Sequence, residues 1–249
     1  DEEISPLQAL AGVGVAFAVS LCVREKLISM GQKVDSLYDL LPYVTIGTIS
    51  DLAPLNSMNL ILCRHGLKAL LQTKDLGLKR FMENKELSLE YPDSEFISFF
   101  IGPMINSKGR LDHPEVALQL LTATQPEDIN KYFEILNQTN FERKKIQQEV
   151  FEQAKADVKE ELLRDENMSA IVIFRPNWHE GVIGIVASKL VEEFKRPAIV
   201  FTNSDKKGLI KASARTAMGI DIFKALKSVE HYFLKFGGHK AAAGLTLEL

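Results

Sequence analysis

Residues 236–247 read FGGHKAAAGLTL: two glycines, a histidine, a run of small residues and an ending typical of a β-strand. Because Gly237 and Gly238 lack a Cβ atom, another group can approach the backbone closely, and the amide N–H groups of such a segment can bind an anion. His239 adds a hydrogen-bond donor. The segment predicts either a site where a ligand lies against the backbone or a tight turn that leads into a buried strand.

Length and composition indicate an ordinary globular chain. With 249 residues, of which 46% are hydrophobic, it can bury the core of one large domain or of two smaller ones. Cys22 and Cys63 show neither the CxxC spacing nor the Cys/His spacing of a zinc site, and two cysteines make no disulfide framework. We therefore expect a reducing, cytoplasmic environment.

The longest apolar run covers residues 7–23 and includes Gln8 and Ser20. It is short for a membrane span. The acidic DEE at residues 1–3 stands where a signal peptide would carry positive charge. The run predicts a buried helix and no association with a membrane.

The charge is distributed unevenly although the net charge is only −3. Residues 1–81 carry 8 basic and 8 acidic side chains, residues 82–169 carry 10 and 18, and residues 170–249 carry 12 and 7. A basic final third suits a local anionic ligand better than general binding to polyanions. A lysine-rich face that only contacts solvent is the alternative.

The pattern of apolar residues predicts an α/β fold with two α/β lobes joined by a long connector helix. YVTIGTI at residues 43–49 predicts a buried strand, and residues 59–71 predict a helix. A long helix is expected to begin at Pro126 and to end near Leu163, with apolar residues at four-residue spacing in its second half. The final third predicts a second α/β unit, with strands at residues 169–174, 196–201, 208–214 and 243–249 and helices at residues 181–194 and 219–229.

Two loops of this second unit carry candidate ligand-binding residues. Trp178 and His179 lie between a predicted strand and a helix that begins near Gly181, and a helix N-terminus with an imidazole suits a phosphate. The alternative is that Trp178 packs beneath the loop. Ser213 and Arg215 end a predicted strand on one side, and the planar guanidinium of arginine fits a phosphate. An exposed arginine at the end of a strand is also common.

Asp51 is the one carboxylate that the sequence places like a metal ligand, just after the predicted strand at residues 43–49. Mg²⁺ and Mn²⁺ need several oxygen ligands, so one aspartate does not make a two-metal centre. Asn106 and Arg110 lie in a predicted polar loop. Asp112 and His113 stand directly before Pro114, which favours a helix N-cap over a metal pair.

Six segments, taken in order, resemble the RecJ branch of the DHH phosphoesterase superfamily. They are LAGVGVAF (10–17), IGTISDLAPL (46–55), GPMINSKGRL (102–111), WHEGVIGIVASKL (178–190), KASARTAMGID (211–221) and FGGHKAAAGLTL (236–247). The resemblance covers nearly the whole chain. It implies that residues 1–125 are the C-terminal part of a DHH phosphoesterase domain, that residues 126–165 are a connector helix, and that residues 166–249 are a DHH-associated substrate-binding domain.

The resemblance also implies a function. RecJ-like proteins degrade single-stranded DNA from the 5′ end in DNA repair and recombination, with two Mn²⁺ or Mg²⁺ ions. Asp51 would be a catalytic metal ligand. The residues that would contact the DNA or its phosphates are Asn106, Arg110, His179, Ser213, Arg215, Gly237, Gly238 and His239.

The DHH motif of the family stands upstream of the segment that matches LAGVGVAF, and this chain begins a few residues before that segment. We therefore expect a piece of a longer exonuclease, without most of the metal site and without appreciable activity alone. Two alternatives stay open: a DHH phosphodiesterase that acts on short oligonucleotides or cyclic dinucleotides, and a non-catalytic nucleic-acid-binding relative. The presence of Asp51 disfavours the second. Protein partners in DNA repair are not indicated.

Overall fold

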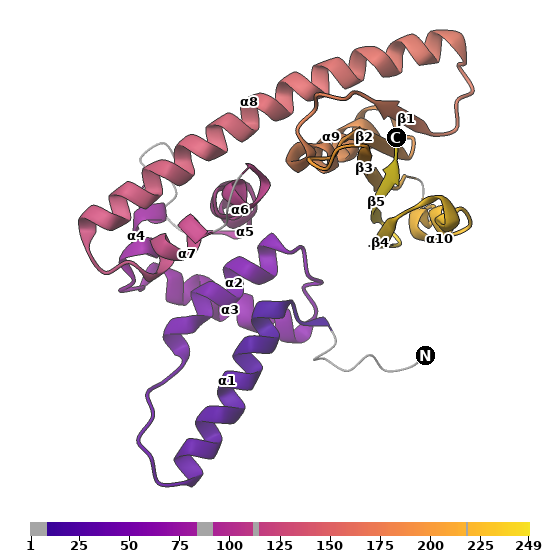
Figure 1. The fold of residues 1–249 in the computed structure, drawn as a ribbon. Coiled ribbons are helices and arrows are strands. Elements are labelled where there is room, and N and C mark those ends of the chain that lie inside the picture. Colours follow the sequence, from indigo (N-terminus) through magenta and orange to yellow (C-terminus); the bar gives the residue numbers. More distant parts are fainter. Residues whose placement is uncertain (1–8, 84–91, 112–114, 218) are drawn as a thin grey trace. The chain divides into compact units, whose positions relative to one another are not determined.

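The computed structural model describes residues 9–83, 92–111, 115–217 and 219–249. The chain divides into two compact units, residues 1–140 and residues 141–249 (Figure 1). Each unit has its own hydrophobic core. The expected α/β class is confirmed, since helices accompany a five-stranded sheet.

The described part of the first unit contains helices and no strand. The elements are α1 (Gly12–Ser29), η2 (Tyr38–Leu40), α2 (Leu41–Ser50), α3 (Ser57–Leu71), α4 (Leu76–Met82), α5 (Ser94–Phe96), the π-helix η3 (Ile97–Ile101), α6 (Gly102–Leu111), α7 (Glu115–Thr122) and the first part of α8 (Pro126–Arg164). The helix predicted at residues 59–71 is therefore confirmed. The strand predicted at residues 43–49 is wrong, because these residues belong to α2.

Burial explains why α2 is a helix despite its β-branched residues. A continuous apolar run fits a buried helix as well as a buried strand, because it shows neither period. Pro42 stands in the first turn, where a helix tolerates proline. Val44, Ile46 and Ile49 are buried. Their burial offsets a helix propensity that is lower than that of alanine by about 0.5 kcal/mol per β-branched residue.

A glycine lets α3 approach α2 closely. An added Cβ at Gly66 would overlap the Thr45 hydroxyl and the Leu41 carbonyl, and both of these residues belong to α2. Backbone atoms cannot move aside as the end of a long side chain can. The close packing of α3 against α2, the helix that ends at Asp51, therefore depends on Gly66.

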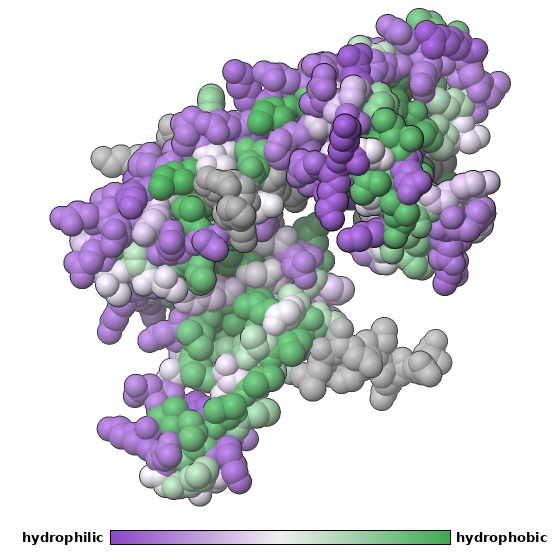
Figure 2. Space-filling model, viewed as in Figure 1, coloured by the Kyte–Doolittle hydropathy of each residue, from purple (hydrophilic) through white to green (hydrophobic). Residues whose placement is uncertain are grey.

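Helix α1 confirms the expected helix but not its burial. Among its residues only Gly14 is buried, while Val15, Val19 and Val23 are each about half exposed. Apolar residues are consequently visible along α1 at the surface (Figure 2). The helix has apolar residues on all sides and packs against α2, so one side is covered and the others are not. None of the described helices has the length and apolarity needed to cross a membrane.

The long helix α8 is confirmed from Pro126 to Arg164. Its first part contributes Ile129, Phe133 and Leu136 to the core of the first unit. Its second part contributes Val150, Ala154 and Val158, at the predicted four-residue spacing, to a core of the second unit.

The second unit is built on one sheet with strand order β1-β2-β3-β5-β4, in which β1 and β2 are parallel and the other pairs antiparallel. Its further elements are β1 (Ile171–Phe174), α9 (Glu180–Phe194), β2 (Ala198–Asn203), β3 (Leu209–Arg215), α10 (Ile222–Lys227), η4 (Glu230–Tyr232), β4 (Lys235–His239) and β5 (Ala242–Glu248). All were expected except η4 and the edge strand β4.

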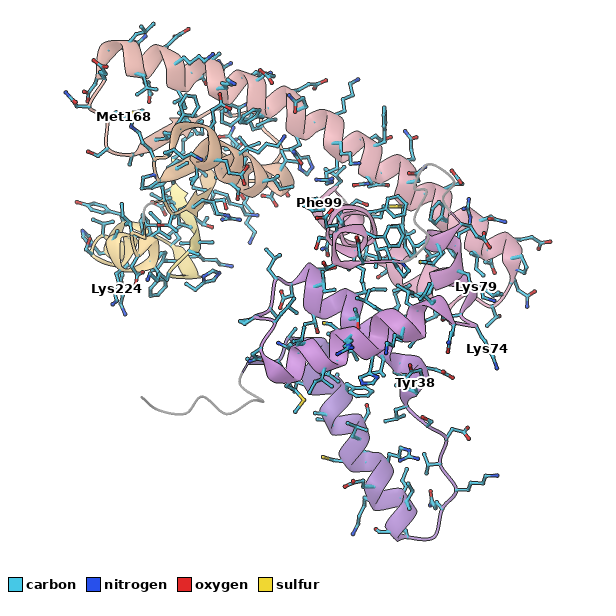
Figure 3. All side chains as sticks on the ribbon, turned by 180° about the vertical axis from the view of Figure 1, so that it is seen from behind. Tyr38, Lys74, Lys79, Phe99, Met168 and Lys224 are labelled. Atoms are coloured by element: carbon cyan, nitrogen blue, oxygen red, sulfur yellow. The ribbon has the colours of Figure 1, made fainter. Side chains whose placement is uncertain are left out.

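Helices cover different parts of the two faces of this sheet. On one face, α9 packs over β2 and β3, and it shares a core with Ile171 of β1 and Val200 of β2. On the other face, α10 packs over β5 and β4, and it shares a buried cluster with Ala212 of β3 and Leu245 of β5. Lys224 projects from α10 into solvent (Figure 3). The first face of β5 and β4 consequently stays open, since Gly244, Gly237 and His239 are exposed.

The contact at Gly66 predicts the effect of adding one methyl group. Gly66→Ala should lower the free energy of unfolding by about 2–3 kcal/mol, because α3 must move away from the backbone of α2. Urea denaturation followed by circular dichroism measures the change. Gly12→Ala is the matched control, since an added Cβ at Gly12 meets no atom within 4 Å. Equal stability of the two variants would contradict the prediction.

Candidate nucleic-acid interface

In the first unit, Asp51 and Asn106 line the same cavity of about 220 Å³. Asp51 ends α2, and Asn106 comes from α6. The loop expected around Asn106 and Arg110 is therefore a helix. The structure describes no side chain for Arg110, and Asp112, His113 and Pro114 lie outside the described residues.

The backbone at Asp51 has two unusual properties. An acidic side chain at the C-terminal end of a helix is unfavourable, because the carbonyl groups there carry partial negative charge. The next residue, Leu52, has a φ of 54°, in the left-handed region that glycine prefers, and its side chain is 84% exposed. A cation bound at this helix end would offset the unfavourable interaction between the Asp51 carboxylate and the negative end of the helix dipole.

Three buried polar groups belong to the segment around Asp51 or to the helix that follows it, and sequence reasoning missed them. Three buried side-chain atoms of the described residues have no hydrogen-bond partner: Thr48 Oγ1, Ser50 Oγ and Asn59 Oδ1. Ser50 lines the cavity, and an added Cβ at Gly102 would lie 2.5 Å from its Oγ. Buried polar atoms normally find partners, so the unpaired Ser50 Oγ on the cavity wall favours a polar ligand or water there.

Asn59 fixes the loop that follows Asp51. Its side chain is completely buried, and its amide nitrogen donates to the carbonyl oxygens of Ala9 and Pro54, each at 2.8 Å. Pro54 stands three residues after Asp51. The only sequence signal for this role was an asparagine beside the proline loop, and such an asparagine usually caps a turn.

The donor set of the cavity does not fit a two-ion centre. Asp51 is the one carboxylate on the described cavity wall, and the described residues contain no cluster of three or more His, Cys, Asp and Glu side chains. Mg²⁺ and Mn²⁺ need more oxygen ligands than this. Asp51 can therefore supply one carboxylate ligand to a metal ion, and the described cavity wall supplies no second carboxylate.

In the second unit, the open part of the sheet forms a surface that we call the glycine face. Strand register places three rows of side chains on it, because directly paired residues point to the same side. The rows are Arg215, Ala242 and His239; Ser213, Gly244 and Gly237; and Lys211, Thr246 and Lys235. Its centre thus has no large side chain, and basic residues stand at both ends.

Arg215 lies at one end of the glycine face, held by its own strand. Its Nη1 donates to Ser213 Oγ and to the Ala214 carbonyl, each at 2.9 Å. Helix α9 passes beside it at Gly184, where an added Cβ would lie 2.9 Å from Arg215 Nη2 and 3.0 Å from Ser213 Oγ. Gly184 therefore leaves room for the guanidinium, which the sequence alone did not indicate.

His179 caps helix α9. Its Nδ1 accepts a hydrogen bond from the Gly181 amide at 3.1 Å, which places the proton of a neutral ring on Nε2. The preceding Trp178 is buried, as in the alternative considered above. Its indole N–H donates to Gln153 at 2.9 Å, and its carbonyl accepts from Thr202 at 2.7 Å. These bonds fix the loop that presents His179.

The structure brings together several of the predicted contact residues. Arg215 and His239 stand in one row across β5, about 10 Å apart at ordinary strand spacing. His239 is exposed, and its Nδ1 accepts from the Ala241 amide at 3.3 Å. The structure does not place His179 with them: its neighbour Glu180 has a carboxylate 2.6 Å from Lys211 Nζ, at the other end of the glycine face.

The two glycines of FGGHKAAAGLTL have different roles. One of the two interpretations placed these glycines in a tight turn. Both instead belong to β4, and the turn is at residues 240–241. An added Cβ at Gly238 would overlap the backbone of Ala242 and Ala243 in β5. An added Cβ at Gly237 meets nothing within 4 Å. The fold therefore requires Gly238, whereas internal packing gives no reason for Gly237.

Comparison with known proteins finds similarity along nearly the whole chain. Residues 167–249 match the DHHA1 domain family. The chain is 35% identical to the single-stranded-DNA-specific exonuclease RecJ of Bacillus subtilis over 243 residues, which is 98% of this chain. It is also 35% identical to RecJ of Haemophilus influenzae, over 97% of the chain.

Along nearly its whole length, the chain is homologous to RecJ. It spans 29% of the B. subtilis RecJ and 44% of the H. influenzae RecJ. The solved structure of Thermus thermophilus RecJ in complex with Mg²⁺ covers 100% of the chain with a TM-score of 0.81 and 29% identity, and the chain covers 36% of it. The same RecJ has also been solved in complex with Mn²⁺.

The contrast between the two glycines predicts a difference in stability. Gly238→Ala should lower the free energy of unfolding by about 2–3 kcal/mol, because the new methyl group meets the β5 backbone. Gly237→Ala should change it by less than about 0.5 kcal/mol. Thermal and urea unfolding of both variants measure this, and an equal loss in Gly237→Ala would show that internal packing requires that glycine too.

Proposed function

We propose that this chain is part of a metal-dependent exonuclease that degrades single-stranded DNA from the 5′ end in DNA repair and recombination in the cytoplasm. Residues 1–125 would belong to the DHH phosphoesterase domain, residues 126–165 would connect, and residues 166–249 would hold the substrate. The observation that carries the proposal is the glycine face, where Gly237 leaves backbone open to a ligand without any internal need.

The glycine face suits a nucleic-acid backbone. Gly237 and Gly244 stand opposite each other, so a strand can lie close to the sheet. Arg215 supplies a planar cation and His239 an imidazole at one end of this surface. Such groups contact phosphates, which carry no base information, and binding should therefore depend little on sequence.

The proposed contacts share a chemical character. Ser213 offers a hydroxyl beside the Arg215 guanidinium at 2.9 Å, so both can donate to one phosphate. His179 stands at the N-terminus of α9, where the helix dipole also favours an anion. Asn106 lines the Asp51 cavity with an amide, and Arg110 belongs to the same helix.

Asp51 would be one ligand of Mn²⁺ or Mg²⁺. The unfavourable helix end and the unpaired Ser50 hydroxyl support a cation with its water at this position. Bound divalent ions would supply an activated water and charge stabilisation at the phosphate. The RecJ structures from T. thermophilus contain Mg²⁺ or Mn²⁺.

Binding of the strand predicts a defined role for Arg215. Arg215→Ala should weaken binding of a 5′-phosphorylated oligothymidine about tenfold and reduce the slope of log K against log salt by about 0.7, because one phosphate contact is lost. Fluorescence anisotropy across a salt series measures both. Arg164→Ala is the control, since Arg164 is an exposed arginine at the end of α8. Unchanged affinity and slope would leave Arg215 with a structural role alone.

The proposed metal-dependent hydrolysis leads to a second prediction, on the release of nucleotides. The 249-residue chain alone should release no nucleotides from a 5′-labelled single strand in Mn²⁺, because Asp51 is the one carboxylate on the described cavity wall. A longer protein that joins this chain to the remaining part of a RecJ sequence should release them, and Asp51→Asn should abolish this release while oligonucleotide binding persists. If the 249-residue chain releases nucleotides and Asp51→Asn abolishes that release, the single-ligand interpretation is contradicted. If the longer protein keeps full activity with Asp51→Asn, Asp51 is not a metal ligand.

A further inference from the structure

The third row of the glycine face has no assigned role. It consists of Lys211 on β3, Thr246 on β5 and Lys235 on β4, which are paired directly across the sheet. Two lysines thus stand on either side of a hydroxyl, at the end of the face away from Arg215 and His239. The rows at the two ends are four residues apart along each strand, which corresponds to about 13 Å.

This distance matters because a nucleic-acid strand carries a phosphate on every nucleotide. A strand that contacts Arg215 and continues along the sheet over Gly237 and Gly244 reaches the lysine row within a few nucleotides. The centre of the face offers no large side chain that blocks this path. Lysine binds a phosphate as a point charge, and the threonine hydroxyl can donate to it.

One of the two lysines is already neutralised. Lys211 Nζ lies 2.6 Å from Oε2 of Glu180, and the side chains of both residues are about one third exposed. Glu180 is the first residue of α9, where the helix dipole stabilises its negative charge. A phosphate that reaches Lys211 therefore meets an ion pair rather than a free cation, and Glu180 repels it.

We propose that Lys211, Thr246 and Lys235 form a second phosphate subsite, and that Glu180 limits its affinity. The proposal rests on the proposed binding of single-stranded DNA to the glycine face. An exonuclease that advances along a strand must release each phosphate after every step. The Glu180 carboxylate lowers the affinity of the subsite for a phosphate of the DNA strand, while Lys211, Thr246 and Lys235 keep their positions.

The acidic side chain has a matched counterpart on the same helix. Glu193 of α9 also forms an ion pair at 2.6 Å, with Lys155 of α8. Lys155 belongs to α8 and not to the open strands. Replacing either glutamate by glutamine removes one negative charge from α9, but only Glu180→Gln removes it beside the glycine face.

The experiment is a salt titration of oligothymidine binding to the 249-residue chain and its variants, read by fluorescence anisotropy. Glu180→Gln should raise the affinity about threefold to tenfold at low salt and steepen the slope of log K against log salt by about 0.7, as for one additional phosphate contact. Lys235→Met should lower affinity and slope. Glu193→Gln should leave both near their original values, and far-ultraviolet circular dichroism verifies the fold of each variant.

The outcomes separate the subsite from the function on which it rests. If binding depends on Arg215 but Glu180→Gln behaves like Glu193→Gln, the subsite is refuted and the proposed function stands. If both glutamine variants gain affinity equally, net charge alone is responsible, and the subsite is again refuted. If the original chain and Glu180→Gln both fail to bind oligothymidine at low salt, the proposed use of the glycine face fails, and the subsite with it.

Discussion

Incomplete covering of the sheet is the constraint on which the second unit depends. On one face of the five-stranded sheet, α9 packs over β2 and β3, while on the other face α10 packs over β5 and β4. Neither helix spans the whole width. The part of the first face that belongs to β5 and β4 therefore carries small and polar residues, and this is where Gly237, Gly244 and His239 stand.

Glycine serves different physical purposes at different positions of this chain. At Gly66 it allows two helices of the first unit to approach, and at Gly238 it allows two strands to approach. At Gly237 it faces open space. Gly66 and Gly238 are therefore required by contacts within the fold, whereas Gly237, inside a strand, leaves room for an external partner. Position in the sequence does not separate these cases, because Gly237 and Gly238 are adjacent.

Local sequence patterns correctly predicted the helices and strands whose apolar residues recur with a clear period or form a short apolar run. The spacing from Ile146 to Leu162 was sufficient for α8, and alternating or apolar runs were sufficient for β1, β2, β3 and β5. Strand β4 was missed because KFGGH offers two glycines and no β-branched residue. The run at residues 43–49 was assigned to the wrong element because it has no period. Asn59, Ser50 and Gly184 act through contacts between distant segments, which no local pattern contains.

The open strand β4 also lies at the edge of the sheet, where a further strand from another molecule can add. Edge strands that attract such additions are long, flat and apolar, whereas β4 has five residues, two of which are glycines, and begins with Lys235. Glycine weakens strand pairing and lysine resists burial. The residues that keep this surface accessible to a ligand thus also protect the chain against aggregation through its own sheet.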